Sequence, residues 1–175
     1  MNDTQNNAPA PAPGRPKAGP APSGGSEPRA AGSVGAPFGW PVRVYWEDTD
    51  AGGIVFYANY LKFFERARTE WLRHLGVEQQ KLREQVGGMF VVTGTQLRYQ
   101  RPARLDDLLL VTARVTESGK ASLTIAQSAL LQTPEGQAPI LLCEGSIRIG
   151  WVDAMTLRPQ RIPAQVLDAL SSGNR

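Results

Sequence analysis

Residues 46–75 read WEDTDAGGIVFYANYLKFFERARTEWLRHL, an acidic turn with two glycines followed directly by a long amphipathic segment. In the second half of this stretch, apolar side chains recur at the spacing of a helix with one buried face: Tyr60, Phe64, Ala67, Trp71 and Leu75. Just before the turn, Val42, Val44 and Trp46 alternate with more polar residues, which is typical of a half-buried strand. The stretch therefore predicts a strand, a tight turn and a long helix.

The turn between strand and helix combines carboxylates with glycines. Gly52 and Gly53 permit backbone conformations that bring Asp50 close to the first amides of the helix, near Phe56 and Tyr57. Those amides have no partner inside the helix, and the helix dipole favours negative charge there, so they can hold an oxyanion. Taken alone, the turn is better explained by ordinary turn and cap hydrogen bonds. A calcium loop is disfavoured, because the apolar run at residues 54–56 replaces the further oxygen ligands that such a loop requires.

The rest of the chain predicts one domain behind a tail. Residues 1–37 are mostly Ala, Pro, Gly, Ser and Asn, too poor in core-forming side chains to fold, so we expect a disordered tail. Residues 38–172 are long enough for one hydrophobic core. We expect a cytoplasmic protein, because neither a signal peptide nor a membrane span is apparent. The net charge of +3 is spread among acidic residues, which gives nucleic-acid binding little support.

Beyond the helix, the sequence predicts a sheet. The helix is expected to end near Gly76, and a short second helix is expected at residues 78–85. Runs rich in Val, Ile, Leu and Thr predict four strands, at residues 89–99, 108–116, 122–131 and 139–149. Turn residues predict hairpins between them, at residues 102–107, 118–120 and 133–136. With the first strand, this pattern predicts an α+β domain with a five-stranded antiparallel sheet around one long helix.

Two long motifs resemble a known family. The runs YWEDTDAGGIVFYANYLKFFERARTEWLRHLG and FVVTGTQLRYQRPARLDDLLLV are similar to the 4-hydroxybenzoyl-CoA thioesterase family of hotdog-fold enzymes. The resemblance is closest to the acyl-CoA thioesterases associated with the Tol-Pal system of Gram-negative bacteria, and it covers roughly residues 40–166. It implies a single hotdog domain that hydrolyses acyl-CoA to the free acid and CoA.

The resemblance also implies roles for residues of the turn. Asp50, the second acid of D-T-D, matches the family's catalytic aspartate, either as a nucleophile or as a general base on water. The amide of Tyr57 matches the donor to the carbonyl oxygen. Tol-Pal relatives often carry His at the position of Tyr57, whereas the hydroxybenzoyl enzymes have Tyr there, as this chain does. No side-chain role is therefore assigned at this position. His74, the single histidine, is expected to be structural at the end of the helix.

Three further polar residues are secondary candidates. Asp48 either orients the turn or is a solvated cap, and Asn59 either contributes to the site or bonds neighbouring backbone. Glu65 matches the helix carboxylate that some hotdog thioesterases use in place of the turn aspartate. While Asp50 is present, an ion pair between Glu65 and Arg68 is the favoured interpretation.

Fewer residues are assigned to binding the CoA end of the substrate. Ser118 and Lys120, in a predicted hairpin turn, resemble the family region that contacts CoA. Arg98, Arg101 and Arg104 are alternatives that nearby acids can neutralise. The sequence contains no metal-binding cluster and no nucleotide-cofactor motif, so CoA is expected only as part of the substrate.

Assembly and acyl specificity complete the expectations. The resemblance implies a homo-oligomer, a dimer or a tetramer, because a single hotdog sheet leaves exposed edges. An acyl carrier protein is a second thioester partner that such a groove admits. The rival function is a non-catalytic module that binds acyl-CoA or acyl carrier protein in envelope or lipid metabolism. Cys143 is expected to be a buried structural thiol, and the acyl pocket is assigned to residues such as Phe56, Phe90 and Val92.

Overall fold

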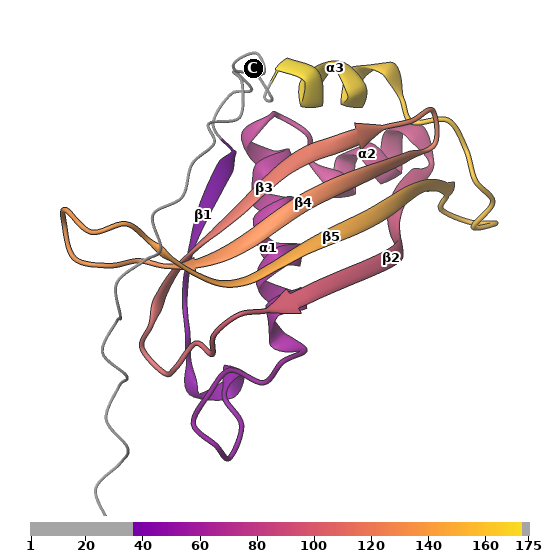
Figure 1. Ribbon diagram of the computed structural model, residues 1–175. Coiled ribbons are helices and arrows are strands. Elements are labelled where there is room, and N and C mark those ends of the chain that lie inside the picture. The colour runs from indigo at the N-terminus through magenta and orange to yellow at the C-terminus, as the bar shows by residue number, and fades with distance from the viewer. Residues whose placement is uncertain (1–36, 173–175) are drawn as a thin grey trace, which may run out of the picture. The chain divides into compact units, whose positions relative to one another are not determined.

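The computed structural model describes residues 37–172, which form a five-stranded sheet with a long helix against one face (Figure 1). In chain order, the elements are β1 (Phe38–Arg43), the 3-10 helix η1 (Trp46–Asp48), α1 (Asn59–His74), α2 (Gln79–Val86), β2 (Gly88–Tyr99), β3 (Leu108–Ser118), β4 (Ser122–Leu131), β5 (Ile140–Asp153) and α3 (Ala164–Ser172). The strand order is β1-β3-β4-β5-β2, and all neighbouring strands are antiparallel. The predicted α+β class and five-stranded antiparallel sheet are confirmed. The predicted tail, residues 1–37, lies outside the described residues except for Pro37.

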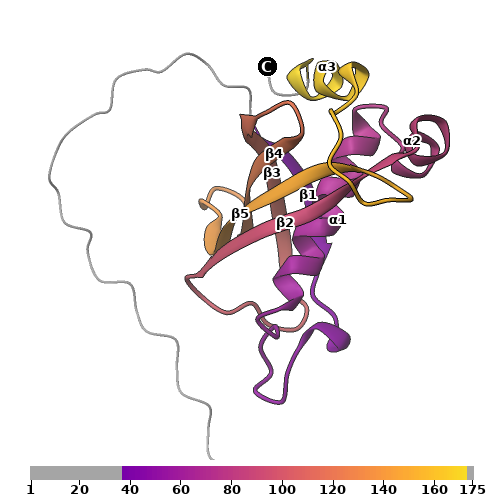
Figure 2. The ribbon, with the colours of Figure 1, turned by 90° about the vertical axis from the view of Figure 1, so that its right-hand side faces the viewer.

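The core lies between α1 and the inner face of the sheet (Figure 2). The buried stripe of α1 includes Phe63, Phe64 and Ala67, none of which is exposed to solvent. On β4, buried and half-buried residues alternate, as expected for a strand with one face against a helix. One buried position of β4 is polar: Gln127 donates to the carbonyl of Phe64 at 3.0 Å, which links the sheet to α1.

The first strand ends earlier than predicted. Val42 and Val44 are buried as expected, but β1 stops at Arg43 and Trp46 begins η1 with 79% of its surface exposed. The chain turns there because the amide of Tyr45 donates to the Asp48 carboxylate at 3.0 Å. This local capping interaction overrides the alternation that continued through Trp46.

One predicted hairpin is wrong. Residues 102–107 do not join paired strands, because β2 pairs with β5 while β3 pairs with β1 and β4. This segment crosses the end of the sheet and bonds to the turn region, through Val44 N to Asp107 O at 3.0 Å and Val55 N to Ala103 O at 2.9 Å. The hairpins at residues 118–120 and 133–136 do join paired strands, as predicted.

The helices match those predicted from the sequence, except for one helix near the C-terminus. Gly76 follows α1 with a φ of 77°, which is the left-handed conformation of a helix-ending glycine. The predicted second helix is α2, whereas α3 was not predicted. Its Val166 and Leu170, one turn apart, are buried, and that spacing together with the preceding Pro163 was an available signal. Over residues 37–172, no helix is long and apolar enough to span a membrane.

β2 approaches β5 closely at Gly145, which predicts a loss of stability when a side chain is added there. A methyl group at Gly145 would lie 2.4 Å from Leu97 Cδ2 and 2.9 Å from the Gln96 carbonyl oxygen, so backbone must shift. We expect Gly145→Ala to destabilise the fold by about 1–3 kcal/mol. Gly94→Ala, in the same pair of strands, is the matched control, because its methyl group would meet only Arg148 Cβ at 3.8 Å. Chemical unfolding of both variants checks this, and equal stability would contradict it.

Candidate active site

Residues 48–57, here called the acid turn, form a narrow loop before α1. Its two legs are joined by a bridge between Thr49 and Val55, and by a hydrogen bond from Asp50 N to the Ile54 carbonyl at 2.9 Å. At the tip, Gly53 has a φ of 69°, and a methyl group at Gly52 would lie 3.1 Å from Asp50 Oδ1. The left-handed conformation at Gly53 favours glycine there, and glycine at position 52 leaves room for the Asp50 carboxylate.

The Asp50 carboxylate is exposed at the tip of the acid turn. Its Oδ1 accepts one hydrogen bond, from the amide of Gly52 at 2.8 Å. This bond fixes the side chain against its own turn and leaves the second oxygen directed to solvent or substrate. The carboxylate is thus oriented and accessible at once.

Asp48 anchors the turn and is not a solvated cap. It is 1% exposed, and its carboxylate accepts the Tyr45 amide. Its carbonyl accepts two further hydrogen bonds, from Phe56 N at 2.9 Å and from Asn59 Nδ2 at 3.0 Å. The buried Asn59 side chain therefore ties the start of α1 to backbone eleven residues away, and not to its neighbours as the simpler interpretation held.

The amide of Tyr57 is free at the opening of α1. The Phe56 carbonyl accepts the Asn59 amide at 2.8 Å, and because a trans peptide directs its C=O and N–H oppositely, the Tyr57 N–H points away from the helix. Within residues 37–172, this amide donates to no protein acceptor. The Tyr57 carbonyl is held by the Tyr99 hydroxyl at 3.0 Å. The result is a positioned donor at a helix N-terminus.

An aromatic cavity of about 280 Å³ lies beside Tyr57. Its lining residues are Ile54, Val55, Tyr57, Tyr60, Tyr99, Gln100, Arg101 and Pro102. The Tyr60 hydroxyl accepts the Ala103 amide at 3.0 Å. Burial raises the pKa of both Tyr60 and Tyr99, so both hydroxyls remain protonated at neutral pH. No local sequence signal links Tyr99 to the site, since nothing near it in sequence indicates that the end of β2 meets the start of α1.

Glu65 lies apart from the acid turn, on the middle of α1. It accepts a hydrogen bond from Thr69 Oγ1 at 2.8 Å, while Arg68 donates to Gln127 Oε1 at 2.7 Å. The expected Glu65–Arg68 ion pair is wrong, because the two ion pairs of the described part join Arg73 to Glu70 and Lys81 to Glu78. Burial lowers the pKa of Arg68, and the charge of Glu65 opposes that shift.

A second, smaller cavity of about 140 Å³ lies between α1 and β2. Glu65 and Arg68 line it together with Phe90 and Val92, two of the three residues assigned to the acyl pocket. Phe56, the third, is 42% exposed on the acid turn and does not line this cavity. The acyl-pocket candidates of one chain are thus divided between two places.

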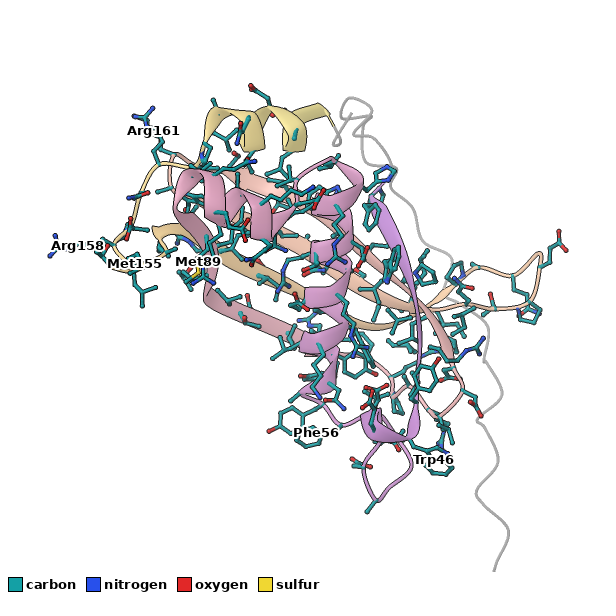
Figure 3. The ribbon with its side chains drawn as sticks, turned by 180° about the vertical axis from the view of Figure 1, so that it is seen from behind. Trp46, Phe56, Met89, Met155, Arg158 and Arg161 are labelled. Atoms are coloured by element: carbon teal, nitrogen blue, oxygen red, sulfur yellow. The ribbon has the colours of Figure 1, made fainter. Side chains whose placement is uncertain are left out.

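The structure does not bring Ser118 and Lys120 to the acid turn. The segment just before β3 bonds to the acid turn, through Val55 N to the Ala103 carbonyl at 2.9 Å, whereas Ser118 ends this strand of 11 residues. A strand of that length spans about 35 Å. Figure 3 shows the same separation, with Arg158 and Arg161 at one end and Trp46 and Phe56 at the other.

Cys143 is buried, and burial raises its pKa to about 12. A thiol with a raised pKa forms thiolate only as the pH approaches that value, so we expect Cys143 to be unreactive at pH 8. A native sample should leave an aromatic disulfide reagent unconsumed, whereas the unfolded chain should consume one equivalent. Rapid reaction of the native protein would contradict this. No group of residues in the described part is arranged to hold a metal ion.

Comparison with known proteins supplies the family. The thioesterase superfamily model matches residues 52–135. An acyl-CoA thioesterase, YbgC, of Haemophilus influenzae is 42% identical over 129 residues, which cover 74% of this chain and 90% of the relative. This chain belongs to the thioesterase superfamily. The Escherichia coli O157:H7 acyl-CoA thioester hydrolase YbgC is 41% identical over 131 residues, 74% of this chain and 92% of that protein.

Solved structures of this superfamily confirm the hotdog fold. A probable thioesterase from Bartonella henselae has a TM-score of 0.66 and 32% identity, covering 73% of this chain and all of that one. A 4-hydroxybenzoyl-CoA thioesterase in complex with 4-hydroxybenzoyl-CoA has a TM-score of 0.70 at 20% identity, covering 75% and 96%. At that identity, the second likeness concerns the fold alone.

Proposed function

We propose that this chain is an acyl-CoA thioesterase that hydrolyses acyl-CoA to the free acid and CoA. The observation that carries the proposal is the acid turn, where the exposed Asp50 carboxylate lies on the same short loop as the unpaired Tyr57 amide. A thioester carbonyl needs a nucleophile or base on one side and a donor for its oxygen on the other. The acid turn offers both groups on one rigid support.

The proposed reaction places the thioester carbonyl oxygen at the Tyr57 amide. Water attacks the carbonyl carbon with Asp50 as general base, or Asp50 attacks first and water then cleaves the resulting anhydride. In the first route, the C–S bond breaks and a C–O bond to the water oxygen forms. In the second route, the C–S bond breaks as the acyl carbon bonds to an Asp50 oxygen, and that C–O bond breaks when water adds to the acyl carbon. In both routes, the proton lost by water is taken up by the leaving CoA thiolate. Negative charge on the tetrahedral intermediate is stabilised by the amide and by the N-terminus of α1.

We infer a homodimer formed through β2. β2 is an edge strand of 12 residues with Val92 54% exposed, whereas β1, the other edge, has six residues and contains Pro41. A long unblocked edge is a template for pairing with a second chain, while proline blunts an edge. Two β2 strands paired antiparallel would make one continuous sheet. A tetramer, built from two such dimers, is the further assembly that the family resemblance favours.

The partners and location follow from the proposed substrate. Acyl-CoA is an intracellular metabolite, so a cytoplasmic enzyme is proposed. An acyl carrier protein presents the same pantetheine thioester and is proposed as an alternative acyl donor. Association with the Tol-Pal system rests on the sequence resemblance and is proposed on that ground alone.

We expect aliphatic acyl-CoA esters to be better substrates than 4-hydroxybenzoyl-CoA. The cavity between α1 and β2 is small, and Phe90 and Val92 give it an apolar wall that suits a short chain. Steady-state hydrolysis of short, long and aromatic acyl-CoA esters measures the preference. A higher kcat/KM for the hydroxybenzoyl ester than for every aliphatic ester would reverse this order.

The proposed function is tested by following CoA release from acyl-CoA esters with a thiol reagent. Hydrolysis with saturation kinetics supports a thioesterase. Tight binding of acyl-CoA without CoA release would instead support the rival function, a non-catalytic binding module. The buried Cys143 is expected not to interfere with the reagent in this assay.

A further inference from the structure

Two peptide planes meet at Tyr57, and each is held by a different part of the chain. The Phe56–Tyr57 peptide carries the proposed oxyanion donor, and its carbonyl accepts the Asn59 amide at 2.8 Å. The Tyr57–Ala58 peptide follows, and its carbonyl accepts the Tyr99 hydroxyl at 3.0 Å. Because peptide planes are rigid, these two contacts restrict both backbone torsions of Tyr57, and with them the direction of its N–H.

The Tyr57 carbonyl lies outside the hydrogen-bond ladder of α1. In a continuous helix this carbonyl would accept the amide four residues later, which is that of Leu61. The Leu61 amide donates instead to the Ala58 carbonyl at 3.1 Å, with the shorter spacing of a 3-10 turn. The Tyr99 hydroxyl therefore takes the place of a helical partner. Without that hydroxyl, the Tyr57 carbonyl would be free to turn toward Leu61, and the backbone at Tyr57 would have a second conformation.

The ring of Tyr99 is itself supported from the core. It packs edge-on against Tyr60, with the two ring centroids 5.7 Å apart. Tyr60 is 2% exposed, and its hydroxyl accepts the Ala103 amide at 3.0 Å, so its ring is fixed. Tyr99 also contacts the Tyr57 ring edge-on, at 6.4 Å between centroids. β2 thus presents a held hydroxyl to a carbonyl 42 residues earlier in the chain.

We propose that Tyr99 is a positioning residue for thioester hydrolysis, whose hydroxyl holds the Tyr57 carbonyl so that the Tyr57 N–H stays directed at the thioester oxygen. The inference rests on the proposed thioesterase function and deepens it. It makes the oxyanion site depend on the end of β2 as well as on the start of α1.

The proposed role predicts an effect on the transition state more than on substrate binding. Negative charge develops on the carbonyl oxygen only as the tetrahedral intermediate forms, so that is when a well-directed donor stabilises most. Displacement of a group by about 1 Å can cost about a hundredfold in rate. Loss of the Tyr99 hydroxyl should therefore lower kcat and leave KM nearly unchanged.

Tyr99→Phe removes the hydroxyl and keeps the ring. We expect kcat to fall about tenfold to a hundredfold, with KM within about twofold and the melting temperature little changed. Thr116→Val is the matched control, because it removes a side-chain hydroxyl that donates to another backbone carbonyl, that of Thr124 at 3.1 Å. This control should keep kcat within about twofold. Unchanged kcat in Tyr99→Phe, or an equal loss in both variants, would overturn the proposal.

A double variant shows whether the hydroxyl acts through the Tyr57 amide. Tyr57→Pro has no amide hydrogen to direct, so adding Tyr99→Phe to it should lower kcat by less than about twofold. Such non-additivity is expected when two residues serve one function. A purely structural contribution of Tyr99 would lower kcat by the same factor with and without Tyr57→Pro, and that result would overturn the proposal.

Failure of the proposed function gives a different result from failure of this inference. If the wild type releases no CoA from any ester, the thioesterase assignment fails. The infrared band of an acyl-CoA labelled at the thioester carbonyl and bound to Asp50→Asn still tests the inference, because a hydrogen bond to the oxygen lowers the stretching frequency. Adding Tyr99→Phe should raise this frequency, whereas adding Thr116→Val should not. A band that stays in place when Tyr99→Phe is added would overturn the inference.

Discussion

Asp50→Asn is expected to lower kcat for acyl-CoA hydrolysis by at least about a hundredfold, the low end for loss of a positioned acid–base group. Asparagine keeps an oxygen that can accept the Gly52 amide, so the acid turn should retain its conformation. The neutral amide is neither a useful base nor a useful nucleophile. KM and melting temperature should therefore change little, and steady-state kinetics with thermal unfolding measure all three quantities.

Asp48→Asn is the control for this prediction. Asp48 is buried and holds the turn through the Tyr45 amide, a contact that an asparagine oxygen can keep. We expect a milder loss of kcat than at Asp50. A larger loss at Asp48 than at Asp50 would show that turn geometry, and not the exposed carboxylate, limits the reaction.

Tyr57→Pro is expected to give the second large effect. Proline has no backbone N–H, so this variant removes the proposed oxyanion donor while α1 still begins two residues later. Loss of one such donor typically costs about 3 kcal/mol, or about a hundredfold to a thousandfold in kcat. The same kinetic assay measures the loss, and melting temperature establishes that the variant is folded.

Tyr57→Ala is the matched variant, because it removes the ring and keeps the amide. The Tyr57 side chain is 63% exposed, so truncation should leave kcat within about threefold. If the alanine variant loses as much activity as a folded proline variant, the ring and not the amide would be the contributing group.

Much of the fold could be predicted because buried side chains recur at short, regular intervals along the sequence. The period of α1 and the alternation along β3 and β4 are decided by which side chains face the core. The end of β1 could not be predicted in this way, since the Asp48 carboxylate captures the Tyr45 amide and turns the chain at Trp46. A single side-chain contact was sufficient to override a pattern of several residues.

Strand pairing could not be predicted from local signals. Turn residues at 102–107 indicate only that the chain changes direction, and they do not identify the strand that β3 will join. Pairing is a long-range choice, made here by β1 and β4 on either side of β3. The same limit explains why α3 was missed, although its two buried residues carry a helical spacing.

The candidate site was partly predictable for a similar reason. Asp48, Asp50, Tyr57 and Asn59 are close in sequence, and one short loop brings them together. Tyr99 lies far from the turn in sequence, so only the folded chain connects its hydroxyl with the Tyr57 carbonyl. Lys120 resembles a family position, but no local pattern indicates that it and Asp50 lie at opposite ends of one chain.

We expect the carboxylate of the acid turn, and not the one on α1, to perform the chemistry. Glu65 is the competing group, since it lines the cavity beside β2 and is also a carboxylate. The most direct test measures kcat for CoA release by Asp50→Asn and Glu65→Gln side by side with the same acyl-CoA ester. We expect kcat to fall at least about a hundredfold in Asp50→Asn and less than about tenfold in Glu65→Gln. Retention of most activity by Asp50→Asn, with activity abolished in Glu65→Gln, would contradict it.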